Sequence, residues 1–360
     1  YYAAKYGVDI DLLTRGAGFG YIGSTITSLI YASFTFIFFA LEAAIMAMAL
    51  HILFGISLAI GYVISALLVL PLVTHGISYI SRFQVWSQPI WVILQLVPLL
   101  FVFQHPDSNF KDWIAFTGIG ENETEARNFN LLLFGSASAI LLSLVAQIGE
   151  QVDFLRFLPE RPKAGRFKWW LALIAAGPGW IFFGALKLFL GSFLAYFALT
   201  QGVDIDLADD PAHMYNLAFS LVFDNPTISL IVACSFVVIS QLKINVANAY
   251  AGSLAWSNFF SRVTRTHPGR VIWTVFNVVI ALLLMELGIY QTIETMLSVY
   301  SVLVLSWLSS VVADLIINKP LGISPKHIEF KRSHLYDINP VGIGAMFISS
   351  FIGITGHYGW

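Results

Sequence analysis

The sequence predicts an all-α membrane protein that crosses the bilayer several times. Of its 360 residues, 58% are hydrophobic and only 11% are charged, whereas a soluble domain carries roughly 25% charged residues. Apolar runs recur along the chain, and a run of about 20 residues is long enough to cross the ~30 Å hydrocarbon core as a helix. Because irregular backbone cannot face lipid, we expect every span to be helical.

The apolar runs predict about nine spans in a single transmembrane domain that covers residues 1–360. The expected spans are 21–48, 53–77, 89–104, 130–150, 169–198, 228–252, 271–289, 292–317 and 341–357. The third is short, which is typical of a tilted or partly buried helix. The opening YYAAKYGVDIDLLTRG is neither a signal peptide nor a span, so we interpret the chain as a piece of a longer protein.

Lysine and arginine are distributed unequally between the connections. Of the 19 such residues, 15 lie in the N-terminal segment and in every second connection after it, whereas the other connections hold only Lys111 and Arg127. Cytoplasmic loops of membrane proteins carry an excess of these residues. We therefore expect a multi-pass protein of the inner (plasma) membrane whose N-terminal segment is cytoplasmic.

The composition gives no support to several other classes of protein. A single cysteine, Cys234, excludes a disulfide framework, and the eight histidines have no spacing typical of metal ligands. No nucleophile–base pair appears in any span, so we expect no enzyme, no cofactor and no metal site. The net charge of −2 gives no reason to expect nucleic acid as a partner. The expected partners are the lipid bilayer and a small-molecule solute.

The stretch SQLKINVANAY, residues 240–250, places polar side chains within an expected span. On a helix, Gln241, Asn245 and Asn248 share one face, while Lys243 and Tyr250 lie on a second face. Two polar faces indicate a helix surrounded by protein or by a cavity. Polar side chains also hold membrane helices together, so packing alone remains an alternative. Five polar residues within eleven favour a functional cavity.

A second candidate lies in FTFIFFALEAA, where Phe38 and Glu42 project together because they are four residues apart. A carboxylate inside the membrane costs about 2.5–3.5 kcal/mol, so it calls for a structural or functional reason. One interpretation is an ion pair with a lysine elsewhere, such as Lys187. The other is a ligand contact in which the phenyl ring stacks on a flat or cationic group.

Several stretches resemble the nucleobase–cation–symport family, the permeases for cytosine, purines, uracil, allantoin and hydantoins. KYGVDIDLLTRGAGFGYIGSTITSLIYASFTFIFFALEAA is similar to the segment that enters the third transmembrane helix of that family. Four further stretches resemble parts of the family and come in the same order as there. The connection of the fourth and fifth helices resembles LVTHGISYISRFQVWSQPIW, and the end of the sixth resembles QVDFLRF. Part of the eighth helix resembles INVANAYAGSLAWSNFF, and the entry to the eleventh resembles YDINPVGIGAMFIS. The resemblance covers nearly the whole chain and is that of a divergent member of the family.

The resemblance implies the LeuT-type fold of two inverted repeats of five helices each. Its first and sixth helices are interrupted at mid-membrane, where substrate and ions bind. On this basis the chain corresponds to family helices three to eleven, and it lacks the first two helices and the last.

The resemblance also implies roles for individual residues. Asn248 matches the asparagine that hydrogen-bonds the substrate, and Phe38 stands in place of the tryptophan that stacks on the flat heterocycle. Glu42 replaces the glutamine that reads the amide edge of the heterocycle, and a carboxylate can only accept hydrogen bonds. The second stacking aromatic of the family is missing near Leu142. The expected substrate-binding residues are Phe38, Glu42, Asn248, Gln147 and Gln241.

Lys243 falls where sodium-coupled members of the family place a hydroxyl residue that ligates the ion. We therefore expect its ammonium group to replace sodium as an ion-site surrogate. Two functions remain open. One is a secondary transporter that moves a small polar solute, heterocyclic (nucleobase-like) or cationic, by alternating access without sodium. The other is a transporter-like sensory input domain fused to or associated with a cytoplasmic signalling domain such as a histidine kinase.

Overall fold

The structure, a computed structural model, describes residues 1–116, 118, 129–162, 165–288 and 293–358. In this part of the chain the regular structure is helical throughout, and seven spans are long and apolar enough to cross a membrane. These spans are α3 (Ser24–Phe54), α5 (Ile77–Gln104), α8 to α9 (Leu131–Leu155), α11 (Gly179–Thr200), α14 (Pro226–Val263), α16 to α17 (Met296–Leu321) and α18 (Pro340–His357). The prediction of an all-α multi-pass protein is thereby confirmed.

Shorter elements complete the chain. Two apolar helices of 17 residues, α4 (Leu58–Thr74) and α15 (Arg270–Glu286), account for two more of the predicted spans. The span of α16 (Ile293–Ala313) continues through η4 (Asp314–Asn318) into α17 (Lys319–Leu321). The remaining elements are α1 (Tyr2–Tyr6), α2 (Ile10–Thr14), η1 (Arg15–Phe19), α6 (Phe110–Ala115), α10 (Arg166–Ala176), α12 (Ile205–Ala208), α13 (Pro211–Ser220) and η5 (Arg332–His334).

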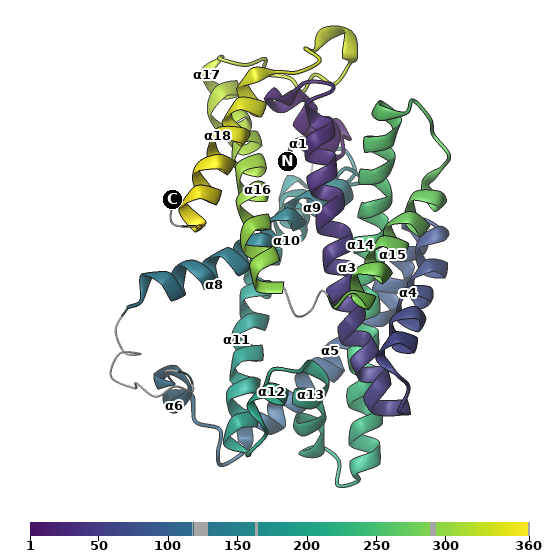
Figure 1. The fold of residues 1–360 in the computed structure, drawn as a ribbon, viewed down its shortest axis with the longest axis vertical. Helices are drawn as coiled ribbons and strands as arrows, with labels where there is room; N and C mark the ends of the chain where they lie inside the picture. Colours follow the sequence, from purple (N-terminus) through teal and green to yellow (C-terminus); the bar gives the residue numbers. More distant parts are fainter. Residues whose placement is uncertain (117, 119–128, 163–164, 289–292, 359–360) are drawn as a thin grey trace.

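Two helical hairpins, α3–α4 and α14–α15, pack against each other and form the centre of the molecule. Helices α3 and α14 run in opposite directions, and their mutual packing is the most extensive of any pair of elements (Figure 1). They have 31 and 38 residues, which at 1.5 Å per residue gives lengths of about 46 and 57 Å. Both exceed the ~30 Å hydrocarbon core, so they cross it tilted or project beyond it.

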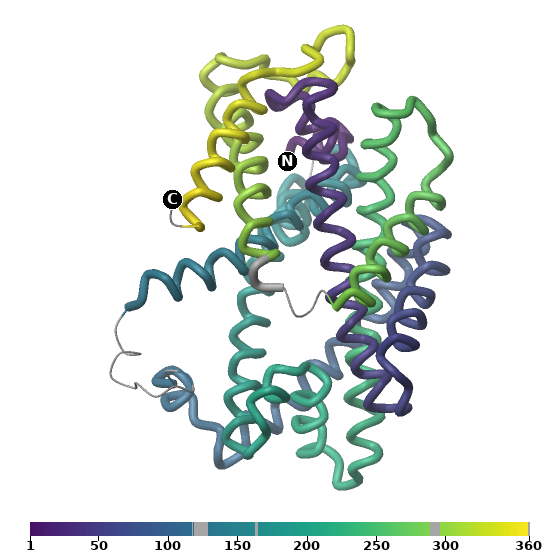
Figure 2. The backbone as a smooth tube through the Cα atoms, viewed as in Figure 1, coloured from purple at the N-terminus to yellow at the C-terminus, as the bar shows by residue number. Residues whose placement is uncertain are grey.

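The two ends of the helix bundle differ in composition. The elements α1, α2 and η1 lie at the same end as the loop from α14 to α15 and the segment 322–339 (Figure 2). Arginines concentrate at this end of the bundle. We refer to the elements α1 to η1, the loop from α14 to α15 and the segment 322–339 together as the basic end. Helices α6, α12 and α13 lie at the opposite end (Figure 1).

Three helices begin at the same local signal, an asparagine or aspartate followed by proline. Asp210, Asn225 and Asn339 accept hydrogen bonds from backbone N–H groups in the first turns of α13, α14 and α18. The proline that follows has no N–H to satisfy, and its fixed φ suits the first helical position. The sequence therefore sets the start of the long helix α14 that carries the polar stretch 240–250.

Several predicted boundaries were wrong. Helix α5 begins at Ile77, not at residue 89, so Arg82 lies within a helix and not in a loop. Helix α14 continues to Val263, eleven residues past the predicted end at 252. Some of the polar residues that lowered the local hydropathy face other helices of the protein, as Gln84 and Ser87 of α5 do in their contacts with Lys243.

The predicted span 169–198 is divided into α10 and α11. Gly177 has φ −95° and ψ −107°, outside the helical region, and Pro178 follows it. Proline disfavours helical geometry in the residue before it and cannot donate to the preceding turn, so the chain bends here.

The close approach of α3, α14 and α15 depends on Gly252. A Cβ atom at this position would lie 2.5 Å from Cγ of Asn277 and 2.6 Å from Oγ1 of Thr35. Those two side chains are joined by a hydrogen bond of 3.1 Å, and Trp256 Nε1 donates to the same Asn277 oxygen at 3.0 Å. The glycine thus makes room for a buried polar contact that joins the three helices.

We expect Gly252→Ala to reduce stability by about 1–3 kcal/mol, because an added methyl group overpacks this contact. The measurement is thermal unfolding of the purified protein in detergent. Gly184→Ala is the matched control, since a Cβ atom there has no neighbour within 4 Å. An equal effect of the two substitutions would show that the packing at Gly252 is not tight.

Candidate functional site

The span Leu131–Leu155 changes its helical geometry between its two halves. Helix α8 (Leu131–Ser143) ends in a 3₁₀ turn, η2 (Leu144–Ala146), and α9 (Gln147–Leu155) follows it. The backbone around this turn stays in the right-handed helical region, so the span is one helix of 25 residues with a tightened turn. The resemblance predicts an interrupted helix in this segment, and the structure has this single 3₁₀ turn in place of a break. Gln147 is the first residue of the second half, and Glu150 follows within its first turn.

The polar face of α14 is buried in protein, as its spacing predicts. Asn245 is fully buried, and Gln241 and Asn248 are 9% and 1% exposed. Asn248 Nδ2 donates to Oδ1 of Asn245 at 3.2 Å. Helix α14 packs most extensively on α3 and also contacts α9, and Gln241 lies close to Glu42 of α3.

Phe38 and Glu42 lie on the face of α3 that points into the protein, near the polar face of α14. The ring of Phe38 packs on Phe34 with centroids 4.6 Å apart, and its side chain is 7% exposed. The carboxylate of Glu42 lies close to the Gln241 side chain of α14. It is also close enough to Glu150 of α9 for the two charges to interact. Glu42 of α3 therefore lies near Gln241 of α14 and near Glu150 of α9.

Lys187 of α11 reaches this region from a fourth helix. Its charge acts on Glu42, but the two groups form no ion pair within 4.0 Å. The ammonium nitrogen instead lies 5.2 Å from the ring centroid of Trp91, whose Nε1 donates to Ser240 Oγ at 3.1 Å. The interpretation of Glu42 as one half of a close ion pair with Lys187 is therefore not supported.

The structure does not bring Lys243 together with the other candidates. Its Nζ atom donates to Ser87 Oγ at 2.9 Å and to the Gln84 carbonyl at 3.2 Å, both on α5. The amide of Gln84 in turn donates to the Lys243 carbonyl at 2.7 Å. Lys243 thus lies on the second face of α14, and its role as an ion surrogate stays a prediction.

Four buried polar atoms around this region have no partner in the described part of the chain. They are Gln147 Oε1, Glu150 Oε1, Gln241 Oε1 and Asn245 Nδ2. A buried polar group without a hydrogen bond costs about 1–3 kcal/mol, so such groups call for a binding partner. Among the amide atoms, the two glutamine oxygens are acceptors and the asparagine nitrogen, as assigned, is a donor. These three amide atoms suit a small molecule that carries N–H groups.

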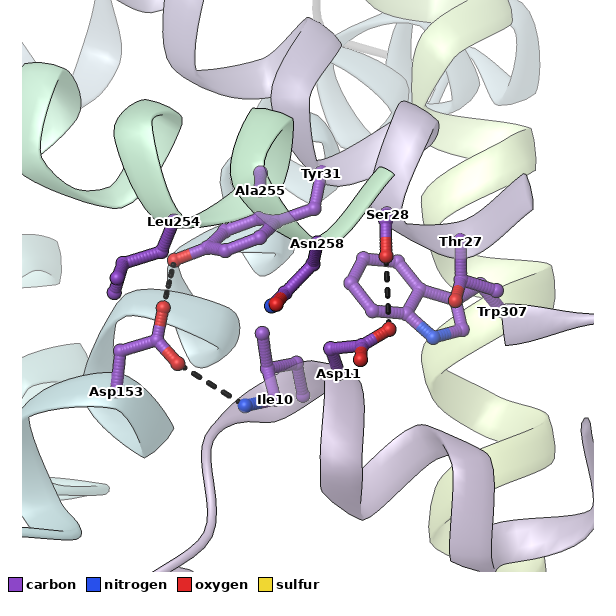
Figure 3. A pocket seen from close by; sticks show the side chains of 10 residues that line it. All are labelled: Ile10, Asp11, Thr27, Ser28, Tyr31, Asp153, Leu254, Ala255, Asn258 and Trp307. Carbon is purple, nitrogen blue, oxygen red and sulfur yellow. Dashed lines mark hydrogen bonds between the residues drawn. The ribbon is translucent and has the colours of Figure 1, made fainter. Parts of the chain in front are cut away.

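A small cavity lies between this region and the basic end (Figure 3). The hydroxyl of Tyr31 donates to Asp153 Oδ2 at 3.1 Å, and the backbone N–H of Ile10 donates to Oδ1 at 3.0 Å. Asn258 of α14 and Trp307 of α16 line the same cavity. Segment 9–11 is thereby connected to α9, the second half of the span Leu131–Leu155.

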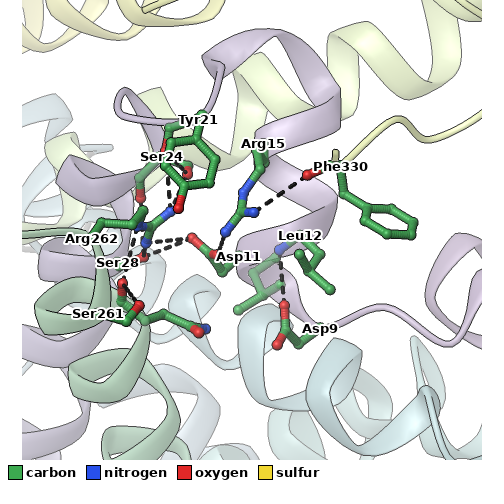
Figure 4. Close-up of polar contacts among 12 residues, drawn as sticks. Asp9, Asp11, Leu12, Arg15, Tyr21, Ser24, Ser28, Ser261, Arg262 and Phe330 are labelled. Atoms are coloured by element: carbon green, nitrogen blue, oxygen red, sulfur yellow. Dashed lines mark hydrogen bonds and ion pairs between the residues drawn. The ribbon is translucent and has the colours of Figure 1, made fainter. Parts of the chain in front are cut away.

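An ion-pair network closes the basic end (Figure 4). Asp11 accepts from Arg15 and from Arg262, each at 2.7 Å, and from Ser28 Oγ at 2.9 Å. The side chains of Asp11 and Arg262 are only 3% and 2% exposed. Arg262 also donates to Ser28 at 2.6 Å and to Ser24. The network joins the segment before α3 to the far end of α14.

Two further contacts hold the same segment. Asp9 caps α2 and pairs with Arg156 of α9 at 3.3 Å. Burial, together with the charge of Asp11, raises the pKa of Asp9 above its ordinary value even though Arg156 is beside it. The ring of Tyr21 lies 4.8 Å from the guanidinium groups of both Arg15 and Arg332.

Comparison with known proteins agrees with this arrangement of helices. No family model matches the sequence, and no curated protein matches it. Among solved structures, the chain is similar to Mhp1, a nucleobase-cation-symport-1 family transporter, in a closed conformation with bromovinylhydantoin bound. The TM-score is 0.59 at 16% sequence identity, and the match covers 98% of this chain and 80% of Mhp1.

The chain has the LeuT-type transporter fold. At 16% identity the similarity to Mhp1 establishes the fold, and it leaves the solute and the coupling ion open. The fold explains why the 3₁₀ turn η2, the polar face of α14 and the α3 residues lie in the same part of the molecule, because ligand sites of such transporters lie where the two repeats meet.

Sequence reasoning missed Tyr31 and Trp91. Tyr31 lies seven residues before Phe38 on the same face of α3, so its spacing could have identified it. Trp91 lies next to Lys187 and Ser240 only because three helices converge, and nothing in the sequence indicates this.

Proposed function

We propose that this chain forms part of a secondary transporter that moves a small polar solute, heterocyclic or cationic, by alternating access. The observation that carries the proposal is the group of buried polar atoms without partners on α9 and α14, beside Glu42 and Phe38 of α3. The similarity of fold to a transporter supports it. The ligand seen in Mhp1, a hydantoin derivative, is itself a small heterocycle.

In this proposal each residue has a defined role. The ring of Phe38 stacks on the flat face of the solute, and Asn248 hydrogen-bonds its edge. Glu42 accepts hydrogen bonds from N–H groups, since a carboxylate has no donor to offer. Gln147 and Gln241 supply further amide contacts. The solute is therefore expected to present more donors than acceptors, as cytosine, guanidinium or imidazolium does.

In this proposal the ion-pair network at the basic end keeps that side of the transport pathway closed during one state of the alternating-access cycle. Positive residues concentrate at that end, and in this proposal it faces the cytoplasm. The bound solute would then be released on that side only after the contacts of Asp11 and Arg262 separate.

We also propose that the protein does not use sodium. Lys243 supplies a fixed positive charge on α14, held by Gln84 and Ser87. A permanently tethered cation removes the need for a bound metal ion at that place.

The test is uptake by purified protein in liposomes with a panel of uracil, cytosine, hydantoin, imidazole and guanidinium. We expect saturable uptake of at least one donor-rich member, and no change when choline replaces sodium. Glu286→Gln is the control variant, because Glu286 is exposed at the end of α15. Uptake that requires sodium would contradict the proposed role of Lys243, and no uptake or binding of any member would contradict the transporter proposal.

A further inference from the structure

Glu150 is a buried carboxylate that the proposed solute site does not use. Its side chain lies in the first turn of α9, directly after the 3₁₀ turn η2, and the residue is only 6% exposed. Its Oε1 atom is enclosed and has no hydrogen-bond partner in the described residues. Gly149, the preceding residue, lets the ring of Tyr31 pack against α9, since a Cβ atom there would lie 2.7 Å from the ring.

Within the described residues, the charged groups that act on Glu150 are acidic. They are Asp153, one turn further along α9, and Glu42 of α3. The hydroxyl of Tyr31 is a second titratable group of α3 near Glu150, and that hydroxyl is bound to Asp153. The surrounding face of α14 contributes uncharged amides.

The nearby cations are engaged elsewhere. Arg156 of α9 is paired with Asp9 at the start of α2, and Lys243 of α14 is bound to α5. Lys187 of α11 lies on the Trp91 ring and acts on Glu42. A buried carboxylate without a cationic partner is costly, so its charge must be compensated by a cation that binds.

The ligands around Glu150 favour a proton over a metal ion. Metal cations such as calcium and magnesium require six or more oxygen ligands, roughly, from protein and water. The described residues contain no group of three or more His, Cys, Asp or Glu side chains placed to hold a metal. A proton needs only one free acceptor, and Oε1 of Glu150 is such an atom.

We infer that Glu150 is the binding site of a coupling proton, an inference that rests on the proposed transport function. The proton is taken from water on one side, forms an O–H bond to Glu150 and neutralises its charge. It is later released to water on the other side. Glu42, Glu150 and Asp153 form a series of carboxylates from the solute site toward the basic end, as proton relays inside membranes do.

The direct test is a pH titration of the purified chain followed by infrared difference spectroscopy of its carboxyl groups. Wild-type protein is expected to show a carboxyl signal that is lost in Glu150→Gln and kept in Glu286→Gln. Glu150→Asp, which retains a carboxyl group, is expected to keep a signal at a shifted pH. If the spectra of wild type and Glu150→Gln are identical while both remain folded, the inference is wrong.

A second arm separates this inference from the proposed function. In liposomes, an imposed pH gradient is expected to drive accumulation of radiolabelled cytosine or guanidinium by wild type. Glu150→Gln is expected to exchange the probe across the membrane without accumulating it. Accumulation by Glu150→Gln under the same gradient overturns the inference. Glu150 could instead titrate in a protein that neither transports nor binds any member of the panel. That outcome would support the proton site at Glu150 and contradict the proposed transport function.

Discussion

Replacing Arg262 with alanine is expected to lower the stability of the protein by about 3–5 kcal/mol, because it leaves Asp11 as a buried, partly unpaired charge. Arg262 and Asp11 are 2% and 3% exposed, and their closest atoms are 2.7 Å apart. The guanidinium group also donates to Ser24 and Ser28, so contacts of α14 with α2 and with the start of α3 are lost together. Because Arg15 still pairs with Asp11 in the variant, we expect the loss of stability to lie toward the lower end of this range.

The measurement is thermal unfolding in detergent, with Arg265→Ala as the matched control. Arg265 lies exposed in the loop after α14, and surface substitutions of this kind change stability by about 0.5 kcal/mol or less. A double-mutant cycle with Asp11→Asn isolates the interaction between the two side chains. If Arg262→Ala unfolds at the same temperature as the control, the network does not hold the basic end closed.

The same substitution is expected to affect the conformational cycle. If the Asp11–Arg262 contact closes one side of the proposed pathway, its loss raises the population of the state that is open at the basic end. The native Cys234 is buried near the other end of α14, so a Cys234→Ser background is suited to labelling experiments. We expect a cysteine placed at Ala255, which lines the cavity of Figure 3, to react faster in Arg262→Ala than in wild type.

Glu42→Ala is expected to weaken binding of a donor-rich solute by about 10- to 150-fold, equivalent to about 1.5–3 kcal/mol for a hydrogen bond to a charged group. The physical reason is that Glu42 offers a carboxylate directly to the proposed site, beside Gln241. Glu42→Gln keeps the shape but adds a donor, so it should favour a neutral solute with an accepting edge, such as uracil, over guanidinium.

Equilibrium binding of the two radiolabelled probes measures this change in preference. Glu286→Gln provides the control for loss of one negative charge, since its carboxylate is exposed at the end of α15. Equal affinities of wild type, Glu42→Ala and Glu42→Gln for every probe would remove Glu42 from the site.

The sequence predicted the features that depend on local pattern. The spacing of Gln241, Asn245 and Asn248 predicted a buried polar face on α14, and their exposures confirm it. Asn–Pro and Asp–Pro pairs mark the starts of three helices because capping and proline geometry act within one turn. The resemblance implied an interrupted helix near Gln147, where the structure has only the 3₁₀ turn η2, whose residues are apolar and give no local signal.

Features that depend on distant partners could not be predicted. Hydropathy placed the start of α5 too late, because Gln84 and Ser87 are polar but face Lys243 rather than water. The helical wheel put Lys243 on a separate face of α14, but it could not identify α5 as the neighbour. The pairing of Asp11 with Arg262 likewise depends on how α3 and α14 lie against each other, which is a property of the fold and not of either segment.

The most direct test of the solute site is an experimental structure of the protein with the tightest-binding member of the panel. Our account predicts that the solute lies between Phe38 and α9, within hydrogen-bonding distance of Glu42 and Asn248. It also predicts that at least one of the unpartnered atoms of Gln147 and Gln241 contacts the solute. A solute bound elsewhere, with Glu42 and Asn248 unchanged and uncontacted, would contradict the account.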